Sequence, residues 1–285
     1  MKLSISLCTR QRPGHLVRTV ETTLKNMRND ATRLVIMADE DDYGTLSVKN
    51  KLKDSRVTWS IEPRPDALGT KYNRVMKIAP ADVYMVMVDY APCVTENFDN
   101  VLLEAAQVYP DGYSIIINHL ANLSFSQMNA VTHKLAAKLG GIYPEYFPYW
   151  FVDHWLEEMA KRLGRQVYCD IVMDCARRPG TIGKKEPYLW GALFTWLRAE
   201  RERKAVEIID SEDFDETPAR KVALKRNFAL WDQWSFAINY GLKDDPGEEV
   251  HDDDERYLRL RNPALKFIEE AVKANGLGSD GNLVS

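Results

Sequence analysis

Short apolar runs alternate along the first half of the chain with segments whose apolar residues recur every three or four positions. The runs predict strands, at residues 3–8, 33–38, 57–61, 83–88 and 112–118. The intervening segments predict helices, at residues 16–27, 46–52, 72–78 and 98–108. Because strands that alternate with helices pair in parallel through right-handed crossovers, we predict an α/β fold with a mostly parallel, twisted sheet flanked by helices.

The run VYMVMV at residues 83–88 is expected to be a central strand, because it has no polar alternation and such strands are buried on both faces. It ends at Asp89, and Pro92 then stops the ladder. Asp89 therefore lies at the carboxyl end of a strand, where open α/β sheets bind their ligands. From this residue alone, ligand binding and the satisfaction of backbone N–H groups in a turn are equally supported.

The second half of the chain is predicted to be mainly helical. Its apolar spacing predicts helices at residues 131–139, 155–163, 188–209, 218–240 and 263–274, with one further strand at 165–171. After a polar linker near residue 180, the pattern of alternating strands and helices gives way to helices. We therefore divide the chain into an α/β domain at residues 1–180 and a helical C-terminal extension at 181–285. The acidic stretch at residues 244–255 is interpreted as a solvated loop or a disordered segment.

Composition, net charge and cysteine spacing indicate what class of protein this is. The 285 residues are 45% hydrophobic, which is enough for a substantial core, and a net charge of -4 gives no global basic field for nucleic acid. The four cysteines include no C-x-x-C pair, so we interpret them as reduced, buried thiols and expect a cytoplasmic protein. The longest apolar stretch, at residues 188–197, is about half as long as a bilayer span, so we expect no transmembrane segment.

Four motifs follow the predicted strand ends in a fixed order. They are CTRQRP at residues 8–13, Asp39 in ADEDD, LGTKYN at residues 68–73, and Asp89 in VDYA. In order and spacing they resemble the nucleotide-sugar-binding domain of GT-A glycosyltransferases, a Rossmann-like fold, and are most similar to family 2. The resemblance implies transfer of a sugar from a nucleoside-diphosphate donor, expected to be a UDP-sugar, to an acceptor hydroxyl, with inversion.

The resemblance assigns Asp39 to the nucleotide base and Asp89 to a divalent metal, manganese or magnesium, and through it to the diphosphate. The family motif usually has a second carboxylate two positions after the first, where this chain has Ala91. Hard cations prefer several oxygen ligands, so Asp89 alone provides only part of a coordination shell. The dependence on metal is therefore open at this stage.

Five further residues in the motifs are assigned to donor binding by the same resemblance. Thr9 and Arg12 belong to the turn after the first strand, and either Arg12 or Lys71 could meet the diphosphate. Gly69 would allow close approach of the backbone to the donor, or simply form a turn. Asn73 would brace its loop, contact a phosphate, or only begin a helix.

The segment FVDHWLEEMAKRLGR at residues 151–165 resembles the family's acceptor side, where an acidic residue opens a helix. Asp153 is then the general base that takes the proton of the acceptor hydroxyl. Aspartate is also a preferred N-cap, and one residue can do both. Glu157 lies on the same helix face four residues later and is the substitute base. The aromatic residues between 143 and 150 form either a platform for a sugar or base, or part of the core.

Two other functions remain open from the sequence. Nucleotidyl transfer to a sugar phosphate uses a similar sheet but normally requires a glycine-rich basic loop, and here that loop contains only Gly14. Ala91 also suggests a binding or scaffold module that kept the fold without catalysis. For an enzyme, the acceptor could be a glycan, a lipid, a protein or a hydroxylated nucleic-acid base, the last being disfavoured by the acidic net charge.

Overall fold

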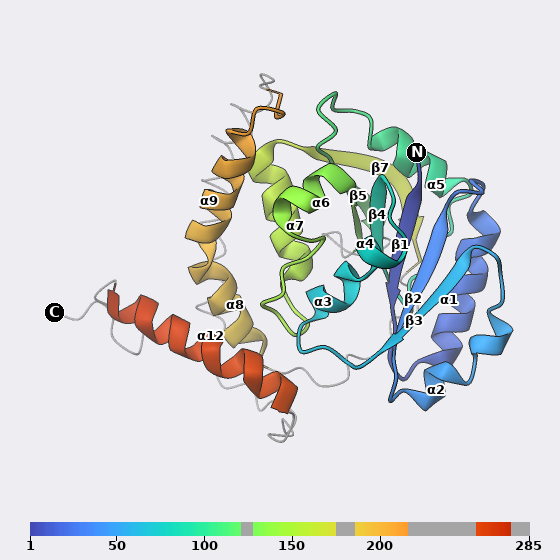
Figure 1. The fold of residues 1–285 in the computed structure, drawn as a ribbon, viewed down its shortest axis with the longest axis horizontal. Coiled ribbons are helices and arrows are strands. Elements are labelled where there is room, and N and C mark those ends of the chain that lie inside the picture. Colours follow the sequence, from blue (N-terminus) through green and yellow to red (C-terminus); the bar gives the residue numbers. More distant parts are fainter. Residues whose placement is uncertain (121–127, 175–185, 216–254, 275–285) are drawn as a thin grey trace.

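The apolar runs of the sequence form one seven-stranded sheet in the computed structural model, which describes all residues except 121–127, 175–185, 216–254 and 275–285 (Figure 1). The strands are β1 (Leu3–Cys8), β2 (Arg33–Asp39), β3 (Val57–Glu62), β4 (Val83–Val88), β5 (Ile115–Leu120), β6 (Asn129–Thr132) and β7 (Gln166–Met173). Their order in the sheet is β3-β2-β1-β4-β6-β5-β7. β4 is the middle strand, as predicted from its continuous apolar run.

The topology creates a switch point beside β1. This strand pairs in parallel with β2 on one side and with β4 on the other. The chain therefore moves from β1 to β2 and β3 in one direction, and then returns across the sheet to form β4. In open α/β sheets a crevice for ligands forms at such a point, outside the carboxyl ends of the strands.

The sheet is mostly parallel, as predicted, but β6 was missed by the sequence analysis. β6 pairs antiparallel with both β4 and β5. Residues 131–139 were predicted to be one helix, whereas 131 and 132 belong to β6 and the helix α6 spans only His133–Leu139. Val131 and Leu135 have helical spacing, but pairing with two neighbouring strands outweighs that local preference.

Helices cover both faces of the sheet (Figure 1). In the described first 174 residues they are α1 (Pro13–Asn26), α2 (Tyr43–Leu46), α3 (Leu68–Asn73), α4 (Val75–Ile78), α5 (Phe98–Ala105), α6 and α7 (Val152–Leu163), with a 3-10 turn at Lys49–Lys51. The stretch LGTKYN, predicted to be mostly loop, is helix α3, and the helix predicted at residues 72–78 is divided between α3 and α4. α1 starts earlier than predicted because Pro13 suits its first turn.

The C-terminal part contains α8 (Pro187–Trp196), α9 (Arg198–Ile209) and α12 (Glu255–Ala274). The single helix predicted at residues 188–209 is therefore two helices. α12 begins eight residues before the predicted start at Pro263, which lies inside it. Trp190 and Tyr257 pack edge to face with ring centres 5.9 Å apart, and so attach α12 to α8. The helix predicted at 218–240 and nearly all of the acidic stretch lie outside the described residues.

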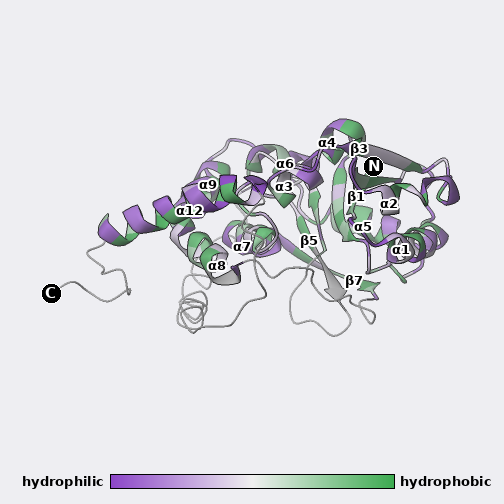
Figure 2. Cartoon of the chain, turned by 90° about the horizontal axis from the view of Figure 1, so that it is seen from below, coloured by the Kyte–Doolittle hydropathy of each residue, from purple (hydrophilic) through white to green (hydrophobic). Residues whose placement is uncertain are grey.

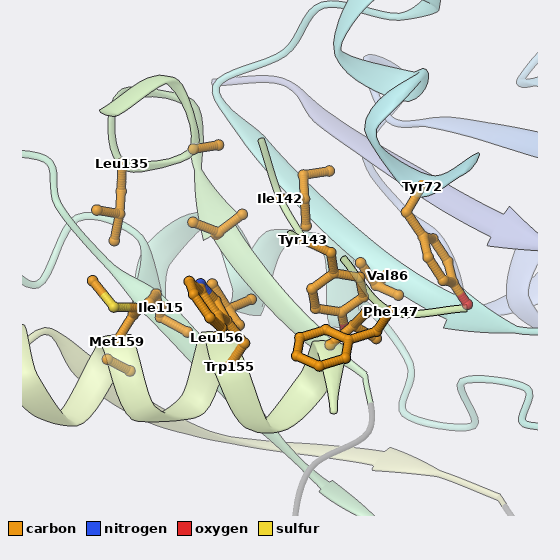
Figure 3. Packing of buried hydrophobic residues seen from close by; sticks show 14 of the residues in the cluster. Tyr72, Val86, Ile115, Leu135, Ile142, Tyr143, Phe147, Trp155, Leu156 and Met159 are labelled. Atoms are coloured by element: carbon orange, nitrogen blue, oxygen red, sulfur yellow. The ribbon is translucent and has the colours of Figure 1, made fainter. Parts of the chain in front are cut away.

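Alternate residues of the strands separate the core into two layers. Val83, Met85 and Met87 of β4 join the layer under α1 and α5, whereas Tyr84 and Val86 point to the opposite layer, under α3, α6 and α7. Figure 3 shows Val86 beside the aromatic side chains of the second layer. Figure 2 shows the strands as largely hydrophobic and the helices as mixed, since each helix turns one face to a layer.

The cysteines in the described residues, Cys8, Cys93 and Cys169, are free thiols, and Cys175 lies outside them. Burial raises the pKa of Cys93 to about 12, so this thiol stays protonated and unreactive at neutral pH. Among the described residues, no helix combines the length and the apolar character that crossing a bilayer demands.

A buried ion cluster joins α7 to α9. The carboxylate of Glu158 lies 2.7 Å from Nε of Arg162 and 2.8 Å from Nε of Arg201. The guanidinium of Arg201 also lies 3.9 Å from the centre of the Phe194 ring. Glu158 and Arg201 are each 2% exposed, so water does not compensate either charge. The C-terminal helices are thus held to the sheet domain by charge as well as by apolar packing.

We expect Glu158→Ala to lower the free energy of unfolding by about 3–5 kcal/mol, because it leaves two arginines without their shared carboxylate. Urea denaturation followed by circular dichroism measures the change. The matched control is Glu157→Ala on the same helix, where the pair with Lys161 is in partial contact with solvent and predicts a loss of at most about 1 kcal/mol. Equal losses in the two variants would contradict the role of the buried cluster.

Candidate active site

Three neighbouring strands deliver polar side chains to one rim of the sheet. Thr9 follows β1, Asp39 ends β2 and Asp89 follows β4, and all three are at most 3% exposed. The hydroxyl of Thr9 donates a hydrogen bond of 2.9 Å to Oδ2 of Asp89. Because β1 lies between β2 and β4, its turn connects the two carboxylates, and the rim lies at the topological switch point.

Lys71 joins the two sides of this rim. It reaches down from α3, with its side chain 7% exposed, and Nζ lies 2.7 Å from Oδ1 of Asp39 and 3.1 Å from the carbonyl oxygen of Thr9. The structure therefore brings Asp39, Lys71, Thr9 and Asp89 into one continuous network, as expected for side chains at adjacent carboxyl ends of parallel strands.

Arg12 contacts Asp89 from the loop that precedes α1. Its NH1 group lies 3.3 Å from Oδ1 of Asp89, and its guanidinium lies 5.6 Å from the centre of the Tyr90 ring. Burial raises the pKa of Asp89, and the charge of Arg12 and the hydrogen bond from Thr9 only partly offset this effect. A cation at this position therefore stabilises the ionised carboxylate.

Arg10, which was not among the predicted site residues, also contacts the rim. Its NH1 group lies 3.0 Å from Oδ2 of Asp39, and NH1 and NH2 lie 2.7 and 3.0 Å from the two oxygens of Asp41. These hydrogen bonds lower the pKa of Asp41. The sequence contained a signal for this contact, because a basic loop follows β1 and an acidic loop follows β2, its parallel neighbour.

The residues at the rim do not fit a protein-built metal site. Both oxygens of Asp89 are engaged, by Thr9 and by Arg12. Ala91, where the family places a second carboxylate, is completely buried. Among the described residues, no group of three or more histidine, cysteine, aspartate or glutamate side chains is arranged to hold a metal ion. Divalent magnesium or manganese usually requires several oxygen ligands, and both oxygens of Asp89 already have protein partners.

Gly69 and Asn73 hold α3 against the segment at residues 141–145. A Cβ atom on Gly69 would lie 2.1 Å from the carbonyl oxygen of Pro144, so only glycine fits. Oδ1 of Asn73 accepts hydrogen bonds from the backbone N–H groups of Ile142 and Tyr143, at 2.8 and 3.1 Å. The close backbone approach at Gly69 is thus made by the protein itself, and Asn73 braces the loop. Both residues position the helix that bears Lys71.

Asp153 lies in the first turn of α7, but Phe151 occupies the N-cap position. Oδ1 of Asp153 accepts hydrogen bonds of 2.9 Å from both the backbone N–H and Nδ1 of His154. Burial, the largest single effect, disfavours the charged imidazolium of His154, but the charge and hydrogen bond of Asp153, together with the charge of Glu157, raise the pKa of this histidine. Glu157, one turn further along, pairs with Lys161 at 2.7 Å.

Tyr143 is a buried residue of the aromatic segment, 3% exposed. Burial raises the pKa of its hydroxyl, and charge on Asp153 and on Cys8, the last residue of β1, acts in the same direction. Tyr143 and Phe147 are core residues of the second layer, which Figure 3 shows, whereas Tyr146 and Tyr149 are 41% and 38% exposed. The aromatic segment is therefore partly core, with two exposed rings at its surface.

Comparison with known proteins gives the fold. Neither a family model nor a curated protein matches the sequence. Among solved structures, the mannosyltransferase PcManGT from Pyrobaculum calidifontis, in complex with GDP-Man and Mn²⁺, is 13% identical with a TM-score of 0.55, over 96% of this chain and 86% of that one. S. aureus TarS 1-349 with UDP-GlcNAc is 15% identical with a TM-score of 0.56, over 96% and 83%. The chain therefore has the GT-A glycosyltransferase fold.

We expect Gly69→Ala to lower the free energy of unfolding by about 1–3 kcal/mol, because the added methyl group overlaps the backbone of Pro144. Urea denaturation measures the loss. Gly14→Ala is the control, since a Cβ atom there meets nothing within 4 Å and alanine favours a helix. Similar stability of the two variants would contradict the tight contact between α3 and the loop.

We expect Asp153→Asn to lower the pKa of His154, because the substitution removes a negative charge that raises it. NMR titration of the five histidines measures this pKa. His133, whose Nδ1 lies 2.9 Å from the Tyr84 hydroxyl, is the internal control.

The same pair makes the stability of the protein depend on pH. The folded-state pKa of His154 is raised, so the pair stabilises the protein fully below the unfolded-state pKa and loses this effect as pH rises through the folded-state value. An unchanged His154 titration would contradict the pairing.

Proposed function

We propose that the protein is a glycosyltransferase that moves a sugar from a nucleoside-diphosphate donor to an acceptor hydroxyl. The observation that supports this function best is the convergence of Asp39, Asp89 and three cations, Arg10, Arg12 and Lys71, at the switch point of the sheet. A nucleotide sugar combines an aromatic base with hydrogen-bond donors and a negatively charged diphosphate, so it requires both acceptors and cations within one crevice.

Asp39 is proposed to accept hydrogen bonds from the base. Lys71 and Arg10 both contact its carboxylate, which fixes its orientation. Asp89, oriented by Thr9, lies on the other side of β1 and is proposed to face the diphosphate and sugar. The distance along the rim from β2 to β4 spans three adjacent strands, which suits an extended ligand with its base at one end and its sugar at the other.

Asp153 is proposed to act as the general base. An acceptor oxygen attacks the anomeric carbon of the sugar, the hydroxyl proton passes to Asp153, and the bond from the anomeric carbon to the phosphate oxygen breaks. The electron pair of that bond leaves with the nucleoside diphosphate, and a single displacement inverts the anomeric configuration. Glu157 is the substitute base, although its pairing with Lys161 makes it less available.

A nucleotide-sugar-binding module without catalysis is the second candidate. It is favoured by Ala91 and by the protein side chains that already engage both oxygens of Asp89. The two candidates agree on donor binding and differ in turnover. UDP is the expected nucleotide, but since the similar structures include GDP-Man and UDP-GlcNAc complexes, both nucleotides belong in the experiment.

The function is tested by calorimetric titration with UDP- and GDP-sugars, followed by a donor-hydrolysis screen across the donors that bind. We expect Asp39→Asn to weaken donor binding, because the substitution removes the charge held by Lys71 and Arg10. We expect Asp153→Asn to keep donor affinity while lowering turnover by about 10²–10⁴-fold, the usual contribution of a general base.

Asp54→Asn is the control for both variants, since Asp54 pairs with Arg56 before β3, at the opposite end of the strands. It should change neither binding nor turnover. Donor binding without turnover in any condition would favour the binding module. If no nucleotide sugar binds, both functions are wrong.

A further inference from the structure

The diphosphate of a donor requires positive charge, and a divalent ion is the usual source in enzymes that handle nucleotides. At the rim of this protein the position beside Asp89 is instead taken by a side-chain cation. NH1 of Arg12 lies 3.3 Å from Oδ1 of Asp89, and the hydroxyl of Thr9 binds the other oxygen. The carboxylate that would be the metal ligand is thus already paired with a guanidinium.

Ala91 is a second feature that disfavours a metal ion beside Asp89. Its side chain is apolar and fully buried, so it cannot supply the side-chain oxygen ligand that a carboxylate would provide at this position. Two hydrogen bonds also fix the loop that contains it. The hydroxyl of Thr19 donates a hydrogen bond of 2.8 Å to the carbonyl oxygen of Asp89. The side-chain amide of Asn26 donates one of 3.0 Å to the carbonyl oxygen of Cys93. Within the described ranges, no three histidine, cysteine, aspartate or glutamate side chains are placed to hold a metal ion together with Asp89.

Arg12 is the cation best placed to replace the metal. Lys71 is almost enclosed and donates to both Asp39 and Thr9, and Arg10 donates to both Asp39 and Asp41. The side chains of Arg12 and Arg10 are similarly accessible, at 20% and 26% exposed, but the contact of Arg12 with Asp89 is longer than the contacts of Lys71 and Arg10 with Asp39. A guanidinium has five N–H donors in a planar fork, so it can hold a carboxylate and a phosphate at once.

We propose that the guanidinium of Arg12, with Asp89 as its positioning partner, neutralises the donor diphosphate in place of a divalent metal, so that donor binding is independent of metal. This inference rests on the proposed function, because it names the group that meets the diphosphate of the same donor. Asp89 then acts by holding Arg12 in place. The guanidinium also remains beside the nucleoside diphosphate as it leaves, where it stabilises the developing negative charge.

The experiment compares donor binding by calorimetry in EDTA and in manganese or magnesium chloride, using the UDP- or GDP-sugar that binds best. We expect the same affinity, within about twofold, in all three solutions. Arg12→Gln should weaken binding about 10- to 100-fold in EDTA, which corresponds to the loss of charge-assisted hydrogen bonds to phosphate. Arg12→Lys should recover part of that loss, since it restores the charge without the planar fork.

Arg28→Gln is the matched control, because Arg28 follows α1 at the opposite end of the strands and pairs with exposed Glu96. Its donor affinity should equal that of the wild type. Electron paramagnetic resonance of manganese chloride alone should show no binding to the unliganded protein, a readout that is independent of turnover.

Three outcomes would overturn the inference. Donor binding that requires manganese or magnesium would show that a metal is needed and would leave the proposed function intact. Unchanged affinity in folded Arg12→Gln would show that another group meets the diphosphate. The absence of any nucleotide-sugar binding, with or without metal, would refute the proposed function and this inference together.

Discussion

The ion pair between Lys71 and Asp39 is the contact on which the rim depends. Both side chains are nearly inaccessible, and a buried charge is tolerated only when an opposite charge and further hydrogen bonds accompany it. Lys71 meets this condition through Asp39 and the carbonyl of Thr9, and Asp39 through Lys71 and Arg10. One ammonium thus fixes the ends of β1 and β2 relative to α3. Any ligand of this rim meets side chains whose positions are already set.

The mixture of positive and negative side chains limits which ligands the rim can bind. Arg10, Arg12 and Lys71 alternate with Asp39, Asp41 and Asp89, so neither charge is in large excess. A ligand with only negative charge would have to compete with the carboxylates, and one with only donor groups would compete with the cations. A nucleotide sugar has both kinds of group, separated along its length, and therefore can exchange contacts with each side of the network. This complementarity explains why the charge distribution supports such a donor better than a simple anion.

The prediction from sequence succeeded where a pattern was long enough to exclude alternatives. β4 was placed correctly because six apolar residues in succession fit a central strand, and Asp39 and Asp89 met at one rim because parallel strands align their carboxyl ends. β6 is only four residues long, which is too short for a period to be recognised, so periodicity could not reveal it. Bracing was one of the roles that the sequence offered for Asn73, but the loop that Asn73 and Gly69 contact could not be identified, because it lies about 70 positions later in the chain.

The position of α3, and with it of Lys71, also depends on α12, the last helix of the described chain. Arg259 of α12 makes a bidentate contact with Asp66, at 2.8 and 2.6 Å, in the loop that leads from β3 into α3. Arg261 binds Glu186 at the start of α8 in the same way. α12 therefore connects the helical extension to the segment that positions Lys71, as its place beside α8 and below α3 in Figure 1 illustrates. Because α3 is short and has no capping side chain, it cannot be stable alone, and its orientation must come from such contacts. The geometry of the rim consequently depends on residues of the described C-terminal helices as well as on the strand ends.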